Sequence, residues 1–503
     1  MSLLGLDIGT TGCKAVLFRV DGKVLASAYQ EYDFRSPQPG WAELDAPAVW
    51  AKVKDVLCSV AVTSPTDPPR AMAVSSLGEA VVPLTHQREI LGPSLLNFDQ
   101  RGREYLPSIR AQFTDEQLYA INGNTLGNHY TLTKLLWLRD HQPRLYEAAQ
   151  VFLHWSGFTA YMLGAQPAVD YSLANRTLLF DLQKETWSAE ILAKAGLDGS
   201  RLPQPVPSGV QIGALSHNLA AELGLPAGMA IVSGAHDQCA NGVGCGILSA
   251  GQAMYGMGTY FCMMPAYCIR PPAQAMIPRG LNTEHHAVPG LFVSFIYNQG
   301  GALLKWYRDT FAAAEKAQAR IEGRDIYADL IDEIPPGPGK VIILPHFVPT
   351  GPPDFISDSC GVIAGLRLET SRGDILRGIL EGVTYYLREC LESLPGTGIE
   401  IQTLRAVGGG SKSDAWVQLS ADILGRPIER PANPEAGALG AAILAGTAVG
   451  EFSSLAEGCQ AMIQIERDFS PDPARHRSYS DKFEHYRRLW PHMAEYLRDI
   501  AAA

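Results

Sequence analysis

The segment Asp7-Ile8-Gly9-Thr10-Thr11-Gly12-Cys13-Lys14 joins two short apolar stretches near the start of the chain. Leu3–Leu6 precedes it and Lys14–Val20 follows it, so its glycines predict a tight turn between two β-strands. Asp21-Gly22 then predicts a second hairpin, which leads into a third strand over Val24–Tyr32. The opening of the chain is therefore expected to be an antiparallel β-meander.

The first of these turns has the composition of a phosphate-binding turn. Its glycines would let backbone N–H groups approach a phosphate without an intervening side chain. The hydroxyls of Thr10 and Thr11 would add donors, and Asp7 at the strand end could hold a hydrated Mg²⁺. On this motif alone, a glycine-rich turn without a ligand is an equally good interpretation.

Two further glycine-rich turns follow. Gly256-Met257-Gly258-Thr259 offers the same chemistry as the first turn, although a turn between two domains would look similar. Gly408-Gly409-Gly410 separates a strand over Leu404–Val407 from a helix that Ser413 caps and Gly425 ends. A glycine-rich turn before a helix suits a nucleotide, through free N–H groups and the helix dipole, but it also suits a plain β–α turn.

The sequence around the third turn excludes two common classes of nucleotide-binding protein. No G-K-[ST] follows the glycines, so the turn is not a Walker A loop. The G-x-G-x-x-G pattern of dinucleotide-binding proteins is absent as well, which argues against a dehydrogenase.

Asp237 follows a predicted strand over Gly228–Ser233 and precedes glycine-rich backbone, at a point where the chain changes direction. A carboxylate there could accept the proton of an attacking hydroxyl. An ordinary Asp, with a pKa of about 3.9, is a weak base and would act late, as bond formation acidifies the hydroxyl. This suits phosphoryl transfer, in which positioning dominates. A turn or cap residue is the alternative interpretation.

The length, charge and composition of the chain limit the classes of function that it can have. A chain of 503 residues is expected to form two large domains. Its net charge of −11 argues against a nucleic-acid partner. The nine cysteines include no C-x-x-C pair, which indicates reduced thiols, and the N-terminus lacks the basic region of a signal peptide. The uncharged stretch 238–269 is too rich in Gly, Asn and Gln for a membrane span. A cytoplasmic protein is expected.

Taken together, these motifs resemble the FGGY family of carbohydrate kinases, which includes xylulokinases, glycerol kinases and gluconokinases. The resemblance runs from about Leu3 to Phe469 and is carried by Asp7–Lys14, Gly234–Gly244, Gly256–Thr259 and Val407–Val449. It implies an α/β fold of two ribonuclease-H/actin-like domains with a central ATP/sugar cleft. Residues 1–245 would bind the sugar and carry the catalytic Asp, and residues 246–503 would bind the nucleotide.

The resemblance also implies residue roles. Asp237 would be the catalytic base and Asp7 would orient Mg²⁺. The residues expected near ATP are Thr10, Thr11, Gly258 and Thr259 at the phosphates, Gly301 and Lys305 nearby, Gly409, Gly410 and Ser413 at the adenosine, and Lys14. For Lys14, a strand residue facing solvent is the alternative.

The sugar-binding residues are expected after the strand Ala71–Ser75, at Gly78 and Glu79. This pair matches neither the Met-His-Gly of xylulokinases nor the Arg-Glu of glycerol kinases. Glu79 could accept hydrogen bonds from two vicinal hydroxyls, or it could be an exposed loop acid. Asp99 is expected to contact the sugar or to pair with Arg101.

Two other segments could contribute to a site, the first of them by the same resemblance. Asp170–Thr177 resembles the loop that closes the sugar side, although structural caps would look similar. His285-His286 is expected to be a loop pair rather than a metal site.

The expected activity is phosphorylation of a small sugar or polyol by ATP, with D-xylulose as the first choice. Glycerol, gluconate, erythritol and other ketoses stay open, although neither Gly78 nor Glu79 supplies a cation for gluconate. An actin- or chaperone-like ATPase and a catalytically inactive sugar sensor are the alternatives from other classes. The partners would be the sugar and ATP, without nucleic acid or membrane, in a possible homodimer.

Overall fold

The opening of the chain forms the predicted meander. In the computed structural model, which describes residues 1–63 and 67–502, β1 (Ser2–Ile8), β2 (Gly12–Arg19) and β3 (Val24–Glu31) pair antiparallel in sequence order. β1 also pairs in parallel with β5 (Pro69–Ser76), and β5 pairs in parallel with β14 (Ala230–His236). With the antiparallel β13 (Gln211–Ala214) at one edge, these strands form a six-stranded sheet.

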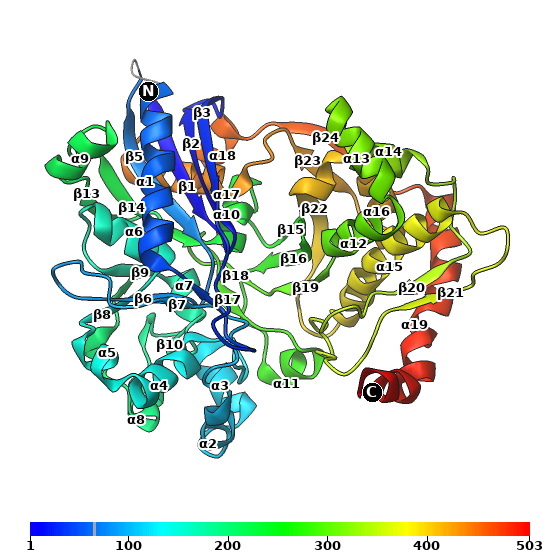
Figure 1. Cartoon of the computed structure of the whole chain (residues 1–503), viewed down its shortest axis with the longest axis horizontal. Coiled ribbons are helices and arrows are strands. Elements are labelled where there is room, and N and C mark those ends of the chain that lie inside the picture. The colour runs from blue at the N-terminus through cyan, green and yellow to red at the C-terminus, as the bar shows by residue number, and fades with distance from the viewer. Residues whose placement is uncertain (64–66, 503) are drawn as a thin grey trace.

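The second half of the chain repeats this topology. β15 (Gly251–Met257), β16 (Tyr260–Tyr267) and β19 (Ile296–Gln299) form an antiparallel meander. β22 (Ile401–Val407) and β23 (Ile428–Pro431) add in parallel beside β15, and β24 (Ile465–Phe469) closes the edge antiparallel. Short strands β17 (Glu284–His285) and β18 (Phe292–Val293) extend the other side. The two sheets stand side by side, and the two predicted phosphate turns are equivalent first hairpins (Figure 1).

Alternation along β1 separates the two faces of the first sheet. Leu4, Leu6 and Ile8 share one apolar core with residues of α1 (Ala46–Thr63) and α6 (Trp155–Leu163). Leu3 belongs to a different core, on the face covered by α10 (Asp237–Gly244) and α17 (Ala436–Ala448). Because side chains alternate along a strand, Asp7 shares this second face with Leu3.

Helix α17 belongs to the second half of the chain but packs on the first sheet (Figure 1). Its Ala- and Gly-rich sequence allows very close backbone contact. A Cβ atom on Gly5 would lie 1.8 Å from the carbonyl oxygen of Ala438, and one on Gly440 would lie 2.0 Å from that of Ala240. The proposed division at residue 245 therefore separates the two sheets, whereas α17 joins the two halves.

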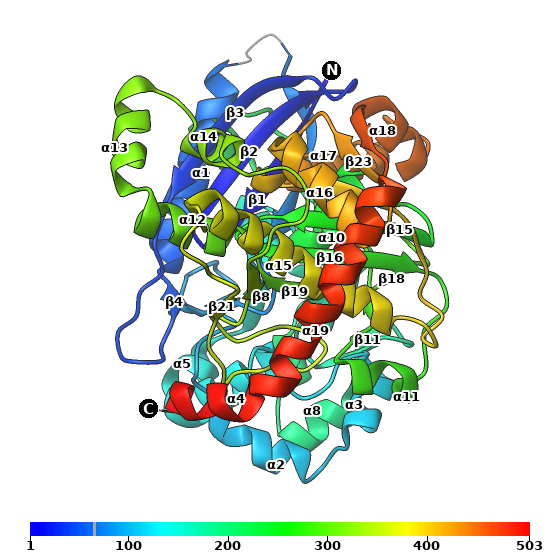
Figure 2. The same ribbon diagram turned by 90° about the vertical axis from the view of Figure 1, so that its right-hand side faces the viewer.

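Other helices of the second half pack around the second sheet. They include α12 (Gly301–Phe311), α15 (Arg372–Ser393), α16 (Asp414–Leu424) and the long α19 (Pro473–Ala502), which contacts both α15 and α16 (Figure 2). The predicted caps of α16 are confirmed: the Ser413 hydroxyl accepts the amide of Trp416 at 3.2 Å, and Gly425 ends the helix with a φ of 62°.

The remaining elements are short. The other strands form two-stranded pairs: β4 (Glu43–Leu44) with β7 (Ser94–Leu95), β6 (Val81–Leu84) with β8 (Val151–His154), β9 (Ala168–Asp170) with β12 (Gln204–Val206), β10 (Phe180–Asp181) with β11 (Thr186–Trp187), and β20 (Ile342–Leu344) with β21 (Val362–Ala364). The other α-helices are α2 (Leu106–Arg110), α3 (Asp115–Asn122), α4 (Thr131–His141), α5 (Pro143–Ala148), α7 (Tyr171–Asn175), α8 (Ala189–Ala195), α9 (His217–Leu223), α11 (Ala273–Met276), α13 (Ala313–Glu322), α14 (Ile326–Asp332) and α18 (Leu455–Met462).

The prediction for the segment His285-His286 is partly wrong. His285 lies in strand β17, so the prediction of a loop is wrong for this residue, whereas His286 directly follows the strand; both side chains are buried. β17 has only two residues, both polar, so its sequence carries no apolar alternation that would indicate a strand. All nine cysteines are free. Over the described 1–63 and 67–502, no helix has the length and apolar character that crossing a membrane requires.

Candidate active site

Asp7 and Asp237 come together because three parallel strands end at one edge of the first sheet. In the β-ladder, Asp7 on β1 lies opposite Ser75 on β5, and Ser76 lies opposite His236 on β14. Asp237 is the first residue of α10, directly after β14. Carboxyl ends of parallel strands are a usual position for ligand sites, and the fold thus joins two carboxylates that are far apart in sequence.

The environment of Asp237 strengthens it as a base. Burial, and then the nearby carboxylate of Asp7, raise the pKa of Asp237 to about 7. The side-chain amide Nε2 of Gln238 donates to Asp237 Oδ1 at 3.1 Å, and His236 Nε2 lies 3.3 Å from the same atom. Since 30% of the side chain is exposed, a substrate hydroxyl can reach it. The expectation of an ordinary, weakly basic Asp is therefore corrected.

Asp7 lies in a cluster with excess negative charge. Burial raises the pKa of Asp7, the nearby Glu435 adds to this effect, and the Ser75 hydroxyl opposes it by donating to Asp7 Oδ1 at 2.6 Å. Lys14 Nζ is 2.8 Å from Glu435, so the side chain of Lys14 is held in an ion pair and does not simply face solvent. A bound cation would offset the negative charge that is left on Asp7 and Asp237.

The surroundings of Asp7 fit a hydrated metal ion better than a metal enclosed by protein ligands. A Cβ atom on Gly437 would come within 3.2 Å of the Asp7 carboxylate, so the missing side chain keeps the approach open. No group of three or more His, Cys, Asp or Glu side chains able to hold a metal is found in the described part of the chain. Mg²⁺ typically keeps several waters and binds one or two carboxylates plus phosphates, so Asp7 is a suitable partner.

The first predicted phosphate turn, Gly9–Gly12, is held by hydrogen bonds to its carbonyl groups. The amide of Gly9 donates to Gly12 O at 2.9 Å, and the Tyr32 hydroxyl donates to Gly9 O at 2.8 Å and to Gly12 O at 3.0 Å. The side chain of Thr10 is half-buried and that of Thr11 is exposed. Both threonines are therefore accessible to a ligand.

The second phosphate turn contacts the N-terminus of α12. The amides of Gly300 and Ala302 donate to Thr259 O at 3.1 and 3.0 Å, and the amide of Gly301 donates to Gly258 O at 3.0 Å. These contacts place Gly301 beside the turn. The exposed Lys305 follows one helical turn later.

The third glycine turn approaches the same hairpin. A Cβ atom on either Gly408 or Gly410 would lie 3.1 Å from the carbonyl oxygen of Met257. Gly409 begins a short 3₁₀ turn that ends at Lys412, just before Ser413 caps α16. The structure thus gathers all the nucleotide residues predicted in the second half at one end of the second sheet.

Cys262 on the second hairpin lies close enough to Asp237 for the charge of Asp237 to affect its pKa. Burial raises the pKa of Cys262 on β16 to about 12, and Asp237 contributes to the shift. Burial also raises the pKa of Tyr297 on β19, with contributions from Glu79, Cys262 and Tyr260. Tyr260 directly follows the second phosphate turn. The second hairpin and Glu79 therefore lie near Asp237.

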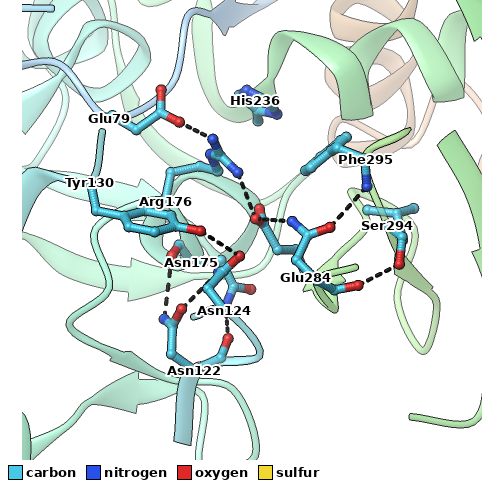
Figure 3. A network of polar contacts seen from close by, with 12 residues as sticks. Glu79, Asn122, Asn124, Tyr130, Asn175, Arg176, His236, Glu284, Ser294 and Phe295 are labelled. Atoms are coloured by element: carbon cyan, nitrogen blue, oxygen red, sulfur yellow. Dashed lines mark hydrogen bonds and ion pairs between the residues drawn. The ribbon is translucent and has the colours of Figure 1, made fainter. Parts of the chain in front are cut away.

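Glu79 forms part of a buried polar network, and Gly78 directly precedes it (Figure 3). Glu79 is only 3% exposed and has a φ of 58°, so it is not an exposed loop acid. Its carboxylate pairs with Arg176. A Cβ atom on Gly78 would lie 3.0 Å from the ring of His236, so the glycine leaves the space that this ring occupies.

Asp99 is buried and bonded to neighbouring groups. Its Oδ2 accepts from Arg101 Nη2 and from the amide of Ala42, both at 2.6 Å, and the side chain is completely buried. Arg101 in turn lies 4.0 Å over the ring of Trp41. The structure thus contains the expected Arg101 pair, and a contact between Asp99 and a sugar stays a prediction.

Sequence reasoning did not identify Arg176, Glu284 or His236 as individual site residues. Arg176 lies in the segment 170–177 that resembles a closing loop, but its partner Glu284 is 108 positions away. His236 precedes the predicted base without any motif of its own. Only the tertiary contacts identify these three residues.

The chain matches known proteins over most of its length. Residues 2–244 match the N-terminal domain, and residues 257–449 the C-terminal domain, of the FGGY family of carbohydrate kinases. The xylulose kinase of Bacillus subtilis (strain 168) is 26% identical over 494 residues, which cover 97% of each chain. The glycerol kinase of Acidovorax ebreus (strain TPSY) is 28% identical over 491 residues, which cover 93% of this chain and 94% of that one. The crystal structure of xylulose kinase from Rhodospirillum rubrum has a TM-score of 0.85 at 28% identity and covers 99% of this chain and 100% of that one.

Proposed function

Because this chain belongs to the FGGY family of carbohydrate kinases, which are phosphotransferases with an alcohol group as acceptor, we propose that it transfers the γ-phosphate of ATP to a hydroxyl of D-xylulose. The observation that carries the proposal is the position of Asp237. It is partly exposed, lies beside Asp7, and has a pKa of about 7. A carboxylate of this kind can both orient an acceptor hydroxyl and take its proton near neutral pH.

The residues divide into an acceptor side and a phosphate side. Asp237 would accept the hydroxyl proton, while Glu79 would accept hydrogen bonds from other hydroxyls of the acceptor. Thr10, Thr11 and Thr259 would donate to phosphate oxygens. Asp7 would hold a hydrated Mg²⁺, which would offset the negative charge of the phosphates. Phosphoryl transfer needs little else from a protein, because positioning and charge stabilisation supply most of the catalysis.

D-xylulose is proposed as the acceptor on the strength of similarity along the whole chain. The Bacillus subtilis relative named xylulose kinase matches over 97% of both chains. The similarity to a glycerol kinase is of the same order, so glycerol, erythritol and other ketoses are the alternative acceptors, together with gluconate.

An acceptor panel tests the proposal. ADP release by the purified protein would be measured with Mg·ATP, alone and with D-xylulose, glycerol, erythritol, ribulose or gluconate. We expect acceptor-dependent ADP release that is highest with D-xylulose and needs Mg²⁺. ADP release that no acceptor raises would overturn the kinase proposal in favour of an ATPase, and a stronger response to another acceptor would overturn the choice of D-xylulose.

A further inference from the structure

Arg176 connects the two halves of the protein at the acceptor side of the site. Its Nη1 donates to Glu284 at 2.7 Å, and its Nη2 pairs with Glu79. The guanidinium lies between the rings of Tyr130 and Phe295, each centred 5.5 Å away (Figure 3). Only 13% of the Arg176 side chain is exposed, against 3% for Glu79 and 1% for Glu284. Both terminal nitrogens of the Arg176 guanidinium therefore pair with carboxylates.

These three residues, which we call the Arg176 triad, have no positive charge to offer a ligand. Two carboxylates face one guanidinium, and even a proton on Glu79 would leave the triad neutral. Arg176 stays charged because Glu284 and Glu79 outweigh the cost of its burial, and its pKa is well above the usual range. A third carboxylate that entered here would meet at best a neutral group and, next to it, Asp237.

Nearby basic side chains do not supply the positive charge that an anionic acceptor would need. Lys134 is buried and its Nζ donates to the carbonyl groups of Asp99 and Arg101 at 2.6 and 2.9 Å. Burial lowers the pKa of His129 to about 3 and that of His236 well below its usual value, so both rings are neutral at physiological pH. Among these neighbours, no cation is free to pair with an anionic acceptor.

The polar atoms without partners also favour hydroxyl groups. Arg176 Nε, Glu284 Oε2 and His236 Nδ1 are buried and have no hydrogen-bond partner within the described residues. Nε can only donate and the carboxylate oxygen can only accept. A hydroxyl, or a water that a hydroxyl orients, can satisfy both kinds of atom, whereas a carboxylate or phosphate can only accept and is repelled by Glu284.

Resting on the proposed kinase function, we infer that the acceptor is an uncharged polyol or ketose and that Glu79 and Glu284, by neutralising Arg176, exclude aldonates and sugar phosphates. The two glutamates are thus specificity-determining residues from opposite halves of the chain. This inference removes gluconate from the open acceptors and leaves D-xylulose, glycerol, erythritol and other ketoses.

The test compares kcat/KM for a neutral acceptor (the best of D-xylulose, glycerol and erythritol) with kcat/KM for gluconate and xylonate. We expect wild-type protein to favour the neutral acceptor by at least about a hundredfold. Glu79→Gln and Glu284→Gln each remove one of the two negative charges that pair with Arg176. Each should therefore reduce the ratio of kcat/KM for the neutral acceptor to kcat/KM for the aldonates by on the order of tenfold or more. The exposed Glu89 provides a matched control, because Glu89→Gln makes the same chemical change away from the triad.

Using a ratio separates charge selection from simple damage to the site. Glu79→Gln is expected to lower absolute rates, but loss of a structural contact would lower both rates together and leave the ratio unchanged. An unchanged ratio in both variants, or a wild-type preference for aldonates, would overturn the inference while the kinase proposal stands. Wild-type protein that phosphorylates none of these compounds would instead refute the proposed function.

Discussion

Asp237→Asn should stabilise the protein while it removes the activity. The pKa of Asp237 is raised from 3.8 to about 7, so the folded state resists ionising this carboxyl. In the unfolded chain the group ionises near pH 4. The folded protein therefore carries a penalty that is absent below about pH 4, grows as the pH rises, and is complete above about pH 7. Asparagine has nearly the same shape and cannot ionise, so it removes the penalty.

The size of the effect follows from the shift. Three pKa units correspond to about 4 kcal/mol at most. Since 30% of the side chain is exposed, solvent screening should reduce the gain to roughly 1–3 kcal/mol. Thermal unfolding would be followed for both proteins between pH 4 and pH 8. The variant should unfold a few degrees higher at pH 8, and this advantage should shrink as the pH falls toward 4.

The same substitution should abolish the proposed base. We expect kcat to fall by roughly 10²–10⁴-fold, the usual scale for losing a general base. For the wild-type protein, kcat/KM should rise by about two orders of magnitude between pH 5 and pH 8, because only the ionised form of a group with a pKa near 7 can take the proton. In the Asp7→Asn variant, kcat/KM should rise at a lower pH than in the wild-type protein, because the negative charge that raises the pKa of Asp237 is gone.

Two results would refute this reasoning. Near-normal turnover of Asp237→Asn would remove Asp237 from the chemistry. Equal or lower stability of the variant at pH 8, with a pH profile that is flat from pH 6 to pH 8 in the wild-type protein, would show that the carboxyl is not held near neutrality.

Three other substitutions test separate parts of the structure. Gly78→Ala places a Cβ atom 3.0 Å from the ring of His236 and should raise the acceptor KM roughly three- to tenfold while the KM for ATP is unchanged; equal changes in both would contradict a local effect. Gly5→Ala forces a Cβ atom to within 1.8 Å of the α17 backbone and should destabilise the protein by about 3 kcal/mol or more in urea unfolding, so a wild-type midpoint would disprove the close packing. Arg101→Ala leaves the buried Asp99 unpaired and should cost about 3–5 kcal/mol by the same assay; an acceptor KM that changes without any loss of stability would instead support a sugar contact.

Local sequence patterns determined the strands, turns and caps near the site. The Asp7–Lys14 turn, the β-meander and the Ser413 and Gly425 caps of α16 depend on residues close together in the chain, and the structure contains them as predicted. The motif resemblance also identified the two-domain α/β fold. These features were predictable because a glycine turn or a helix cap is decided within a few residues.

The tertiary structure alone decided the electrostatics and the long-range partners. The high pKa of Asp237 depends on burial and on Asp7, which is 230 positions earlier, and the ion pair between Arg176 and Glu284 joins opposite halves of the chain. His285 became part of a buried strand although its local sequence predicted a loop. Burial and Coulomb interactions act through space, so the distances that set them are absent from any short stretch of sequence.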